Sequence, residues 1–288
     1  MDDLFQEMAR IILLNDATEK CQAMHNLALI VKQQRSETQP FAQSSESHNL
    51  EFHNLESQTL QSQNPEIKQI DLPGYPEALK LVMPRELKRR GLQSQTGRNI
   101  LMHAVAHIEF NAINLALDAA YRFRGQPIQF YQDWIKIADD EARHFGLIRD
   151  YLNQNDCDYG DLPAHNGLWD MAIRTQHDIV ARMALVPRVL EARGLDVTPG
   201  MIKRLRGVGD DKAVEILNTI YQDEIAHVET GSKWFFYHCK LRMLEPRSTF
   251  LEMVEIHLHG ELRGPFNIAA RLQAGFDEIE MAHLSERY

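Results

Sequence analysis

The sequence predicts an all-α protein built around a bundle of four long helices. Apolar residues recur with helical spacing in four segments, at about 98–123, 129–154, 167–193 and 210–240, and these segments show essentially no strand pattern. Each segment is about 25 residues long, which suits the antiparallel helices of a bundle. Hydrophobic residues make up 44% and charged residues 25% of the chain, which is typical of a soluble globular protein.

The first 34 residues are predicted to form a helical preface to the bundle. One helical face of this region carries four apolar residues, Leu4, Met8, Ile11 and Ile12. Asp16 and Glu19 then have the spacing of a capping box, which marks the beginning of a helix. The sequence therefore predicts two short helices in residues 1–34.

Three further regions surround the bundle. Residues 35–70 are rich in Gln, Ser and Asn and poor in large apolar side chains, so they cannot bury enough surface to offset the entropy cost of ordering. We expect a flexible linker in this region. Residues 71–97 contain closely spaced turn formers, which predict an extended arm that lies on the bundle of residues 98–243. Residues 244–288 are predicted to add a C-terminal helical extension.

The pattern D-E-x-x-H occurs twice, at Asp140–His144 in the second long segment and at Asp223–His227 in the fourth. Residues three apart share a face of a helix, so the glutamate and histidine of each copy can bind the same ion. Apolar residues lie one and two turns away, which predicts that both motifs face the core. A buried carboxylate without a partner costs several kcal/mol, and a metal ion would compensate its charge. The ligands predicted from the two copies are Glu141, His144, Glu224 and His227.

The two remaining long segments each offer a further carboxylate. Glu109 lies on an otherwise apolar face of the first segment. In the third segment, Glu191 continues the apolar stripe, whereas Asp178 lies on the polar face. Matching the lengths of antiparallel helices favours Asp178, but loop lengths can shift that register while the apolar stripe is fixed by the sequence. We therefore predict Glu191 as the fourth carboxylate and keep Asp178 as the alternative.

This set of side chains predicts a centre that binds two metal ions. One glutamate from each of two helices and a Glu-x-x-His from each of two others are the ligands of dinuclear carboxylate bundles. Carboxylate and imidazole ligands suit two iron ions, or two manganese ions, and no thiolate joins them to favour zinc or copper. Asp140 and Asp223 are predicted to accept the second ring N–H of a histidine ligand on the facing helix. Tyr221, one turn before Glu224, is a candidate neighbour of the metals.

Several long motifs of the chain closely resemble the ferritin-like domain of unknown function 455 family. The resemblance covers about Asp71 to Glu286, and the runs that carry it are His103–Glu109, Asp140–Phe145, Tyr159–His165, Leu190–Asp196, Asp223–Val228 and Gly264–Asn267. It implies a ferritin-like four-helix bundle with extra N- and C-terminal helices. Matched residue by residue, it implies the ligand set Glu109, Glu141, His144, Glu191, Glu224 and His227, which supports Glu191 over Asp178. The family's name leaves its reaction open, and a similarity of fold to tRNA-modifying di-iron hydroxylases says little about the substrate.

Composition excludes several other classes of protein. No run of about 18 apolar residues occurs and the chain starts with acidic residues, so we expect a cytoplasmic protein without a membrane segment or secretory signal. Three widely spaced cysteines predict neither a disulfide framework nor a thiolate zinc site. A net charge of -10 makes nucleic acid an unlikely partner.

The leading functional hypothesis is a di-iron oxidase or hydroxylase that uses molecular oxygen and acts on a substrate the sequence does not identify. The alternatives are non-enzymatic. One is a metal-binding protein that stores or detoxifies iron, and the other is a binding module whose bundle is stabilised by metal. The sequence is compatible with a monomer and with a homodimer.

Overall fold

The computed structural model describes residues 1–38, 67–87, 91–258, 262 and 264–287. Within these residues every regular element is helical, apart from one isolated β-bridge between Leu81 and Ala164. The prediction of an all-α fold is therefore confirmed. Most of the predicted linker, 35–70, lies outside the described residues, and the helix before it extends to Thr38.

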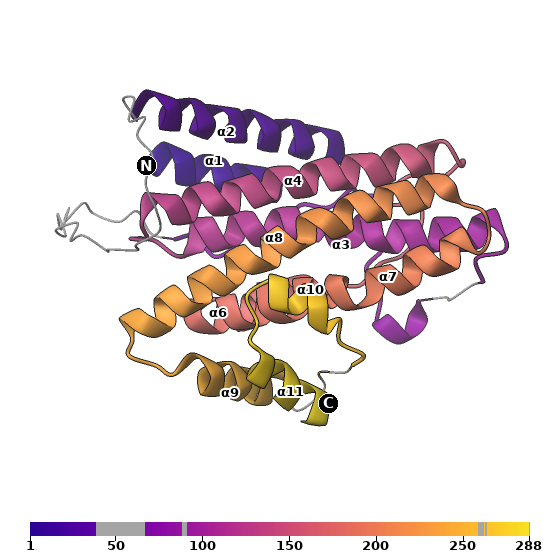
Figure 1. Ribbon diagram of the computed structural model, residues 1–288. Coiled ribbons are helices and arrows are strands. Elements are labelled where there is room, and N and C mark those ends of the chain that lie inside the picture. The colour runs from indigo at the N-terminus through magenta and orange to yellow at the C-terminus, as the bar shows by residue number, and fades with distance from the viewer. Residues whose placement is uncertain (39–66, 88–90, 259–261, 263, 288) are drawn as a thin grey trace.

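The helices lie in stacked layers (Figure 1). α1 (Asp2–Leu13) packs on α3 (Gln95–Arg122), and α2 (Ala17–Thr38) packs on α4 (Ile128–Asn153). α8 (Asp211–Leu241) contacts α4 and also the continuous run of α6 (Ile179–Leu185), η2 (Val186–Glu191) and α7 (Ala192–Arg206). The C-terminal extension adds α9 (Pro246–Leu258), α10 (Ile268–Gln273) and α11 (Glu278–Arg287) beyond α6 to α8. Two short elements, η1 (Pro84–Glu86) and α5 (Gly167–Arg174), lie in the connections.

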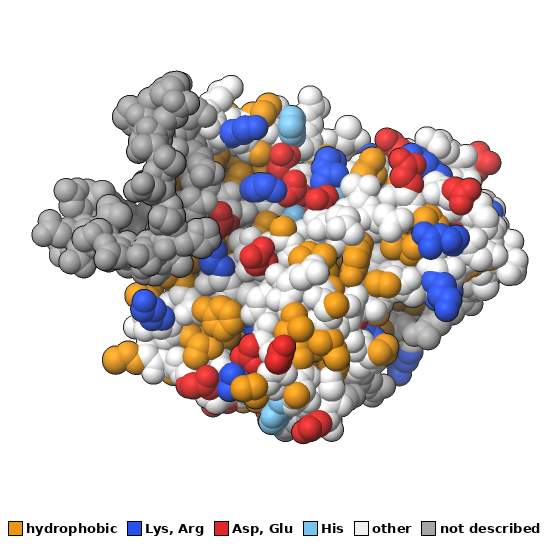
Figure 2. Space-filling model, viewed as in Figure 1, with side chains coloured by type: hydrophobic (Ala, Val, Ile, Leu, Met, Phe, Trp, Pro, Cys, Tyr) orange, Lys and Arg blue, Asp and Glu red, His pale blue; other side chains and the backbone are white. Residues whose placement is uncertain are grey.

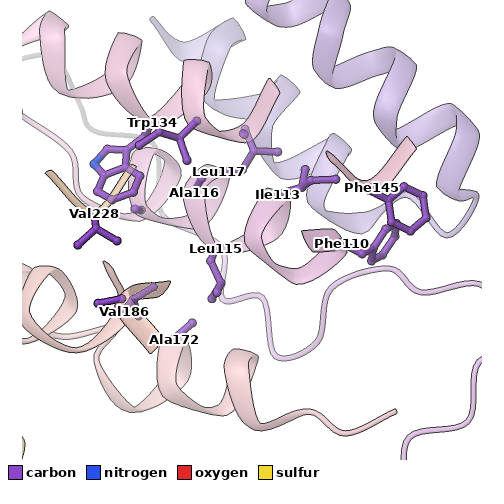
Figure 3. Close-up of a cluster of buried hydrophobic side chains, with 14 of the residues drawn as sticks. Phe110, Ile113, Leu115, Ala116, Leu117, Trp134, Phe145, Ala172, Val186 and Val228 are labelled. Atoms are coloured by element: carbon purple, nitrogen blue, oxygen red, sulfur yellow. The ribbon is translucent and has the colours of Figure 1, made fainter. Parts of the chain in front are cut away.

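α3 is the central helix, and every residue from Glu109 to Arg122 is buried. By length and composition it is the one described helix apolar enough to cross a membrane, but 78% of its apolar window is buried inside the structure. Figure 3 shows Phe110 and Ile113 of α3 within a buried cluster that also contains Trp134 of α4 and Val228 of α8. This position in the core accounts for the hydropathy of α3.

The predicted third helix, 167–193, is wrong in its extent. α5 ends at Arg174, and a new helix begins at Ile179, where the carboxylate of Asp178 accepts a hydrogen bond from the N–H of Val180 at 2.9 Å. The apolar stripe continues across this break, so periodicity alone does not reveal the helix start. The new helix passes through the π-helical turn η2 and ends at Arg206.

α7 also contains Pro199, which removes a backbone donor from the helix. The carbonyl of Leu195, four residues earlier, loses its helical partner as a result. The side chain of Asn267 supplies the missing donor, with Nδ2 3.1 Å from that carbonyl oxygen. A residue that precedes α10 therefore completes the hydrogen bonding of α7.

Lys20 joins the N-terminal helices to the rest of the molecule. Its fully buried Nζ donates hydrogen bonds to the carbonyls of Ile12 and Gly74, at 3.0 and 2.9 Å, and to Asn114 Oδ1 at 2.7 Å. The ammonium also lies 4.6 Å from the centre of the Phe110 ring. Burial lowers the pKa of Lys20 to about 7. α1, α2, the segment before η1 and α3 thus meet at one side chain.

Candidate metal centre

Carboxylate and imidazole side chains meet in the middle of the bundle. Glu109 comes from α3, Glu141 and His144 from α4, and Glu224 from α8. One ligand atom from each of these four residues lies within 4.8 Å of all the others, and all four residues are buried. The helical spacing of apolar residues turns these faces inward, because the rest of each face packs into the core.

Glu141 is the centre of this cluster because it contacts both predicted histidines. Its Oε2 lies 3.3 Å from His144 Nδ1, and its Oε1 lies 2.8 Å from His227 Nδ1. Glu109 Oε2 approaches His144 Nδ1 at 3.2 Å, whereas Glu224 Oε1 lies 3.8 Å from His227 Nδ1. The cluster therefore has a His144 half and a His227 half, and the two halves share Glu141.

Glu191, at the end of η2, lies close enough to the cluster to interact electrostatically with Glu224, Glu141 and His227. Both of its carboxylate oxygens are buried, although the residue as a whole is partly exposed. Burial raises the pKa of Glu191 to about 8, and the negative charges of Glu224 and Glu141 add to this shift. The alternative, Asp178, caps α6 instead and pairs with Arg242 Nη1 at 2.6 Å. The structure thus brings Glu191, and not Asp178, to the other carboxylates.

The outer nitrogens of both histidines contact the aspartates named from the sequence. Asp223 Oδ2 lies 3.0 Å from His144 Nε2, and Asp140 Oδ2 lies 3.2 Å from His227 Nε2. The side chain of Asp223 is 38% exposed and forms an ion pair with Arg143. The side chain of Asp140 is 21% exposed and forms an ion pair with Lys136. On the face in Figure 2, charged side chains of both signs lie over the α2 and α4 region. The aspartates favour a proton on Nε2, so the proton on Nδ1, which faces the cluster, is the one that a metal ion would displace.

Three further polar residues, among them Tyr221, have partners outside the cluster. The hydroxyl of Tyr221 accepts a hydrogen bond from Asn267 Nδ2 at 2.9 Å, so it links α8 to the segment before α10. His107 Nδ1 lies 2.8 Å from the Tyr159 hydroxyl, and His103 Nε2 accepts from the N–H of Gly160 at 3.0 Å. Through these hydrogen bonds, the two histidines of α3 bind the connection between α4 and α5.

Electrostatic interactions shift the pKa values of the buried groups in opposite directions. Burial raises the pKa of Glu109 well above its ordinary value, and the charge of Glu141 adds to the shift. Burial also disfavours ionised Glu141, but the charges and hydrogen bonds of His227 and His144 outweigh it and hold its pKa below the usual range. Burial disfavours charged His144 too, yet Glu109 and Glu141 raise its pKa to about 11.

The buried polar atoms of this cluster fit a metal centre. Among the described residues, two of the predicted ligands have buried carboxylate oxygens without a hydrogen-bond partner: both oxygens of Glu191, and Glu224 Oε2. Native proteins leave few buried polar atoms unpaired. Carboxylate oxygens are ligands that divalent cations bind, so bound metal would satisfy these atoms together.

Metal binding is expected to release protons at neutral pH. With pKa values of about 8 and about 11, Glu191 and His144 both hold a proton at pH 7, and a metal ion must displace it from each. Affinity for Mn²⁺ should therefore rise with pH between about 6 and 8, roughly tenfold per pH unit for each proton displaced. Calorimetric titrations in buffers of different ionisation enthalpy measure both the Mn²⁺ affinity and the number of protons released. An affinity independent of pH would mean that these two groups are not ligands.

The fold and the cluster together define a class of protein, namely a helical bundle with a buried acidic and histidine cluster that could hold a metal ion. The chain belongs to the family described as "Protein of unknown function (DUF455)", which it matches over residues 14–282. This membership confirms the family predicted from the sequence motifs, and the match also includes α2. The chain is 43% identical over 230 residues to an uncharacterized protein of Haemophilus influenzae (strain ATCC 51907 / DSM 11121 / KW20 / Rd), covering 77% of this chain and 80% of that protein. No solved structure matches it.

Proposed function

We propose that the protein is a di-iron carboxylate protein with a ferritin-like bundle, and that it is an oxygen-dependent oxidase or hydroxylase. The observation that carries the proposal is the pair of Glu-x-x-His motifs that face each other across α4 and α8, with Glu109 and Glu191 beside them and unpaired lone pairs among them. Carboxylates and imidazoles without thiolate are the ligands that iron and manganese share. We propose iron because the oxidase or hydroxylase activity requires a metal pair that can supply electrons to oxygen.

The residues of the chain have distinct roles in this proposal. Glu141 would be shared by the two ions, because it contacts both histidines. A reduced iron pair, when bound, supplies electrons to molecular oxygen. Asp140 and Asp223 keep the proton of each histidine on Nε2 and so orient the two rings. Apolar neighbours such as Ile113 on α3 and Ala138 on α4 are fully buried and keep bulk water from the site.

Oxygen uptake by iron-loaded protein tests this proposal. The protein is stripped of metal, loaded anaerobically with ferrous iron, and mixed with oxygenated buffer while dissolved oxygen and the absorption spectrum are recorded. We expect about two iron ions per chain and oxygen uptake much faster than that of the same amount of free ferrous iron. Protein loaded with Zn²⁺, which has no redox chemistry, is the matched control.

The other outcomes point to the other functions. Bound iron without oxygen uptake would overturn the oxidase proposal and favour a metal-stabilised binding module. Continued oxidation of many iron ions per chain, together with a large native mass in light scattering, would instead favour iron storage or detoxification. The same light-scattering measurement decides between a monomer and a homodimer.

A further inference from the structure

Glu191 is held differently from the other three glutamates of the cluster. Glu109, Glu141 and Glu224 each lie within 3.8 Å of a histidine Nδ1 on α4 or α8. Both oxygens of Glu191 instead lack a hydrogen-bond partner among the described residues. Its position is therefore set by the backbone of η2, and whatever fixes η2 also fixes this carboxylate.

Arg188, on the same π-helical turn, ties η2 to the C-terminal extension. The side chain is fully buried, and its Nη2 donates to Glu280 Oε1 of α11 at 2.5 Å. Its Nη1 donates to Ser232 Oγ of α8 at 2.8 Å, and that hydroxyl donates to the carbonyl of Ala274, also at 2.8 Å. One guanidinium thus connects η2, α8 and α11.

Aromatic rings enclose the same guanidinium. Its carbon lies between 4.2 and 5.1 Å from the centres of four rings, those of Phe235, Phe236, Phe250 and Phe276. Such rings stabilise a cation, but they do not neutralise it. The carboxylate of Glu280, itself 3% exposed, is the anion that pairs with it. Without that anion, the buried charge could be stabilised only if η2 moved to bring Arg188 to water.

A second buried ion pair holds the chain just after Glu191. Arg271 of α10 forms two hydrogen bonds with Asp196 of α7, at 2.9 and 2.7 Å, and both side chains are almost fully buried. The backbone N–H of Asn267 also donates to Asp196 Oδ1 at 2.9 Å. The extension therefore holds the chain three residues before Glu191 and five residues after it.

We propose that the C-terminal extension positions Glu191 in the metal centre, with Arg188 and Glu280 as positioning residues. This proposal rests on the proposed function, because it assigns the extension to one half of the same centre. Pro187 of η2 packs directly against Gly231 of α8, one turn after His227, so the His227 half depends on the position of η2. The His144 half is built from residues of α3 and α4, none of which lies on η2.

The test compares Glu280→Gln with Asp118→Asn in the full chain. Asp118 forms a buried pair with Arg182 Nη1 at 2.5 Å, but its partners lie in α3 and α6 rather than in the extension. Mn²⁺ is titrated into each protein while free Mn²⁺ is counted by electron paramagnetic resonance. Asp118→Asn should bind two ions, each with an affinity similar to that of the wild type. Glu280→Gln should keep one ion and bind the other about tenfold more weakly or worse.

Hydrogen exchange of the protein without added metal provides a second readout that does not depend on metal binding. Glu280→Gln should exchange faster than wild type in residues 186–196, and should exchange unchanged in residues 137–147 of α4. Ser232→Ala removes one hydrogen bond to Arg188 and should show the same pattern with a smaller change, which keeps the test open if Glu280→Gln does not fold.

Different results would overturn the metal centre and the positioning role of the C-terminal extension. Two unchanged Mn²⁺ affinities in Glu280→Gln, beside a wild type that binds two ions, would overturn the role of the extension and leave the metal centre intact. No Mn²⁺ binding by the wild type would overturn the metal centre itself. In that case unchanged exchange in residues 186–196 would also overturn the positioning of η2 by the extension, whereas faster exchange there would support that positioning.

Discussion

Glu141→Gln is expected to abolish tight binding of both metal ions while the bundle remains folded. Glu141 is the carboxylate that contacts both histidines, so both halves of the centre lose a ligand charge at once. Two unit charges 4 Å apart interact by on the order of 4 kcal/mol at intermediate polarity, so affinity for divalent ions should fall by several orders of magnitude. Elemental analysis should show a fall from about two ions per chain to well below one.

A buried histidine on α8 provides the matched control for this site. His227→Ala should also lower metal content sharply, because it removes a ligand from one half of the centre. His238→Ala removes an equally buried imidazole from the same helix, but His238 packs against Phe130 and Trp234 instead of the carboxylates. The His238→Ala variant should therefore keep its metal. Equal metal content in all of these variants would show that the cluster is not the binding site.

Gly231→Ala is expected to damage both stability and metal binding. Gly231 lies one turn after His227 on α8, and a Cβ atom there would lie 2.2 Å from Cβ of Pro187 in η2. The two elements would have to separate, which typically costs about 1–3 kcal/mol. The same movement displaces Glu191 from His227, so metal affinity should fall by about tenfold to a hundredfold. Urea denaturation and titration against a coloured chelator measure the two effects.

Gly200→Ala is the control for this substitution. Gly200 lies on α7 in open space, with nothing within 4 Å of an added Cβ. Alanine is the better helix former, so stability should rise by up to about 1 kcal/mol and metal affinity should not change. A Gly231→Ala variant as stable as wild type, with wild-type metal affinity, would show that α8 and η2 tolerate the separation.

The fold was predictable where one helix face carries a long apolar stripe. The segments predicted at 98–123, 129–154 and 210–240 correspond closely to α3, α4 and α8 for this reason. The third segment failed because its break depends on single polar contacts. Asp178 caps a new helix, and Asn267 compensates for Pro199 from 68 residues further along the chain. Periodicity carries no information about such contacts.

The candidate site was likewise predictable in part. Glu141 with His144, and Glu224 with His227, are close in sequence, so helical spacing alone brings each pair to one face. The choice between Glu191 and Asp178 depended on the axial register of two helices, which loop lengths obscure. The pairing of Arg188 with Glu280 was not predicted, because the two residues lie 92 positions apart and no local pattern links them. The metal role of the six predicted ligands stays a prediction until metal is measured.

The contacts of Lys20 determine how much of the chain must be kept in any shortened version of the protein. Its ammonium serves acceptors in three separate segments, the farthest of them 94 residues along the chain at Asn114. A fragment that began at Gln95 would lose this donor and would also expose the faces of α3 and α4 that α1 and α2 now cover. We therefore expect the bundle to be less stable without its N-terminal helices, and a shortened protein intended for study should retain α1, α2 and Gly74.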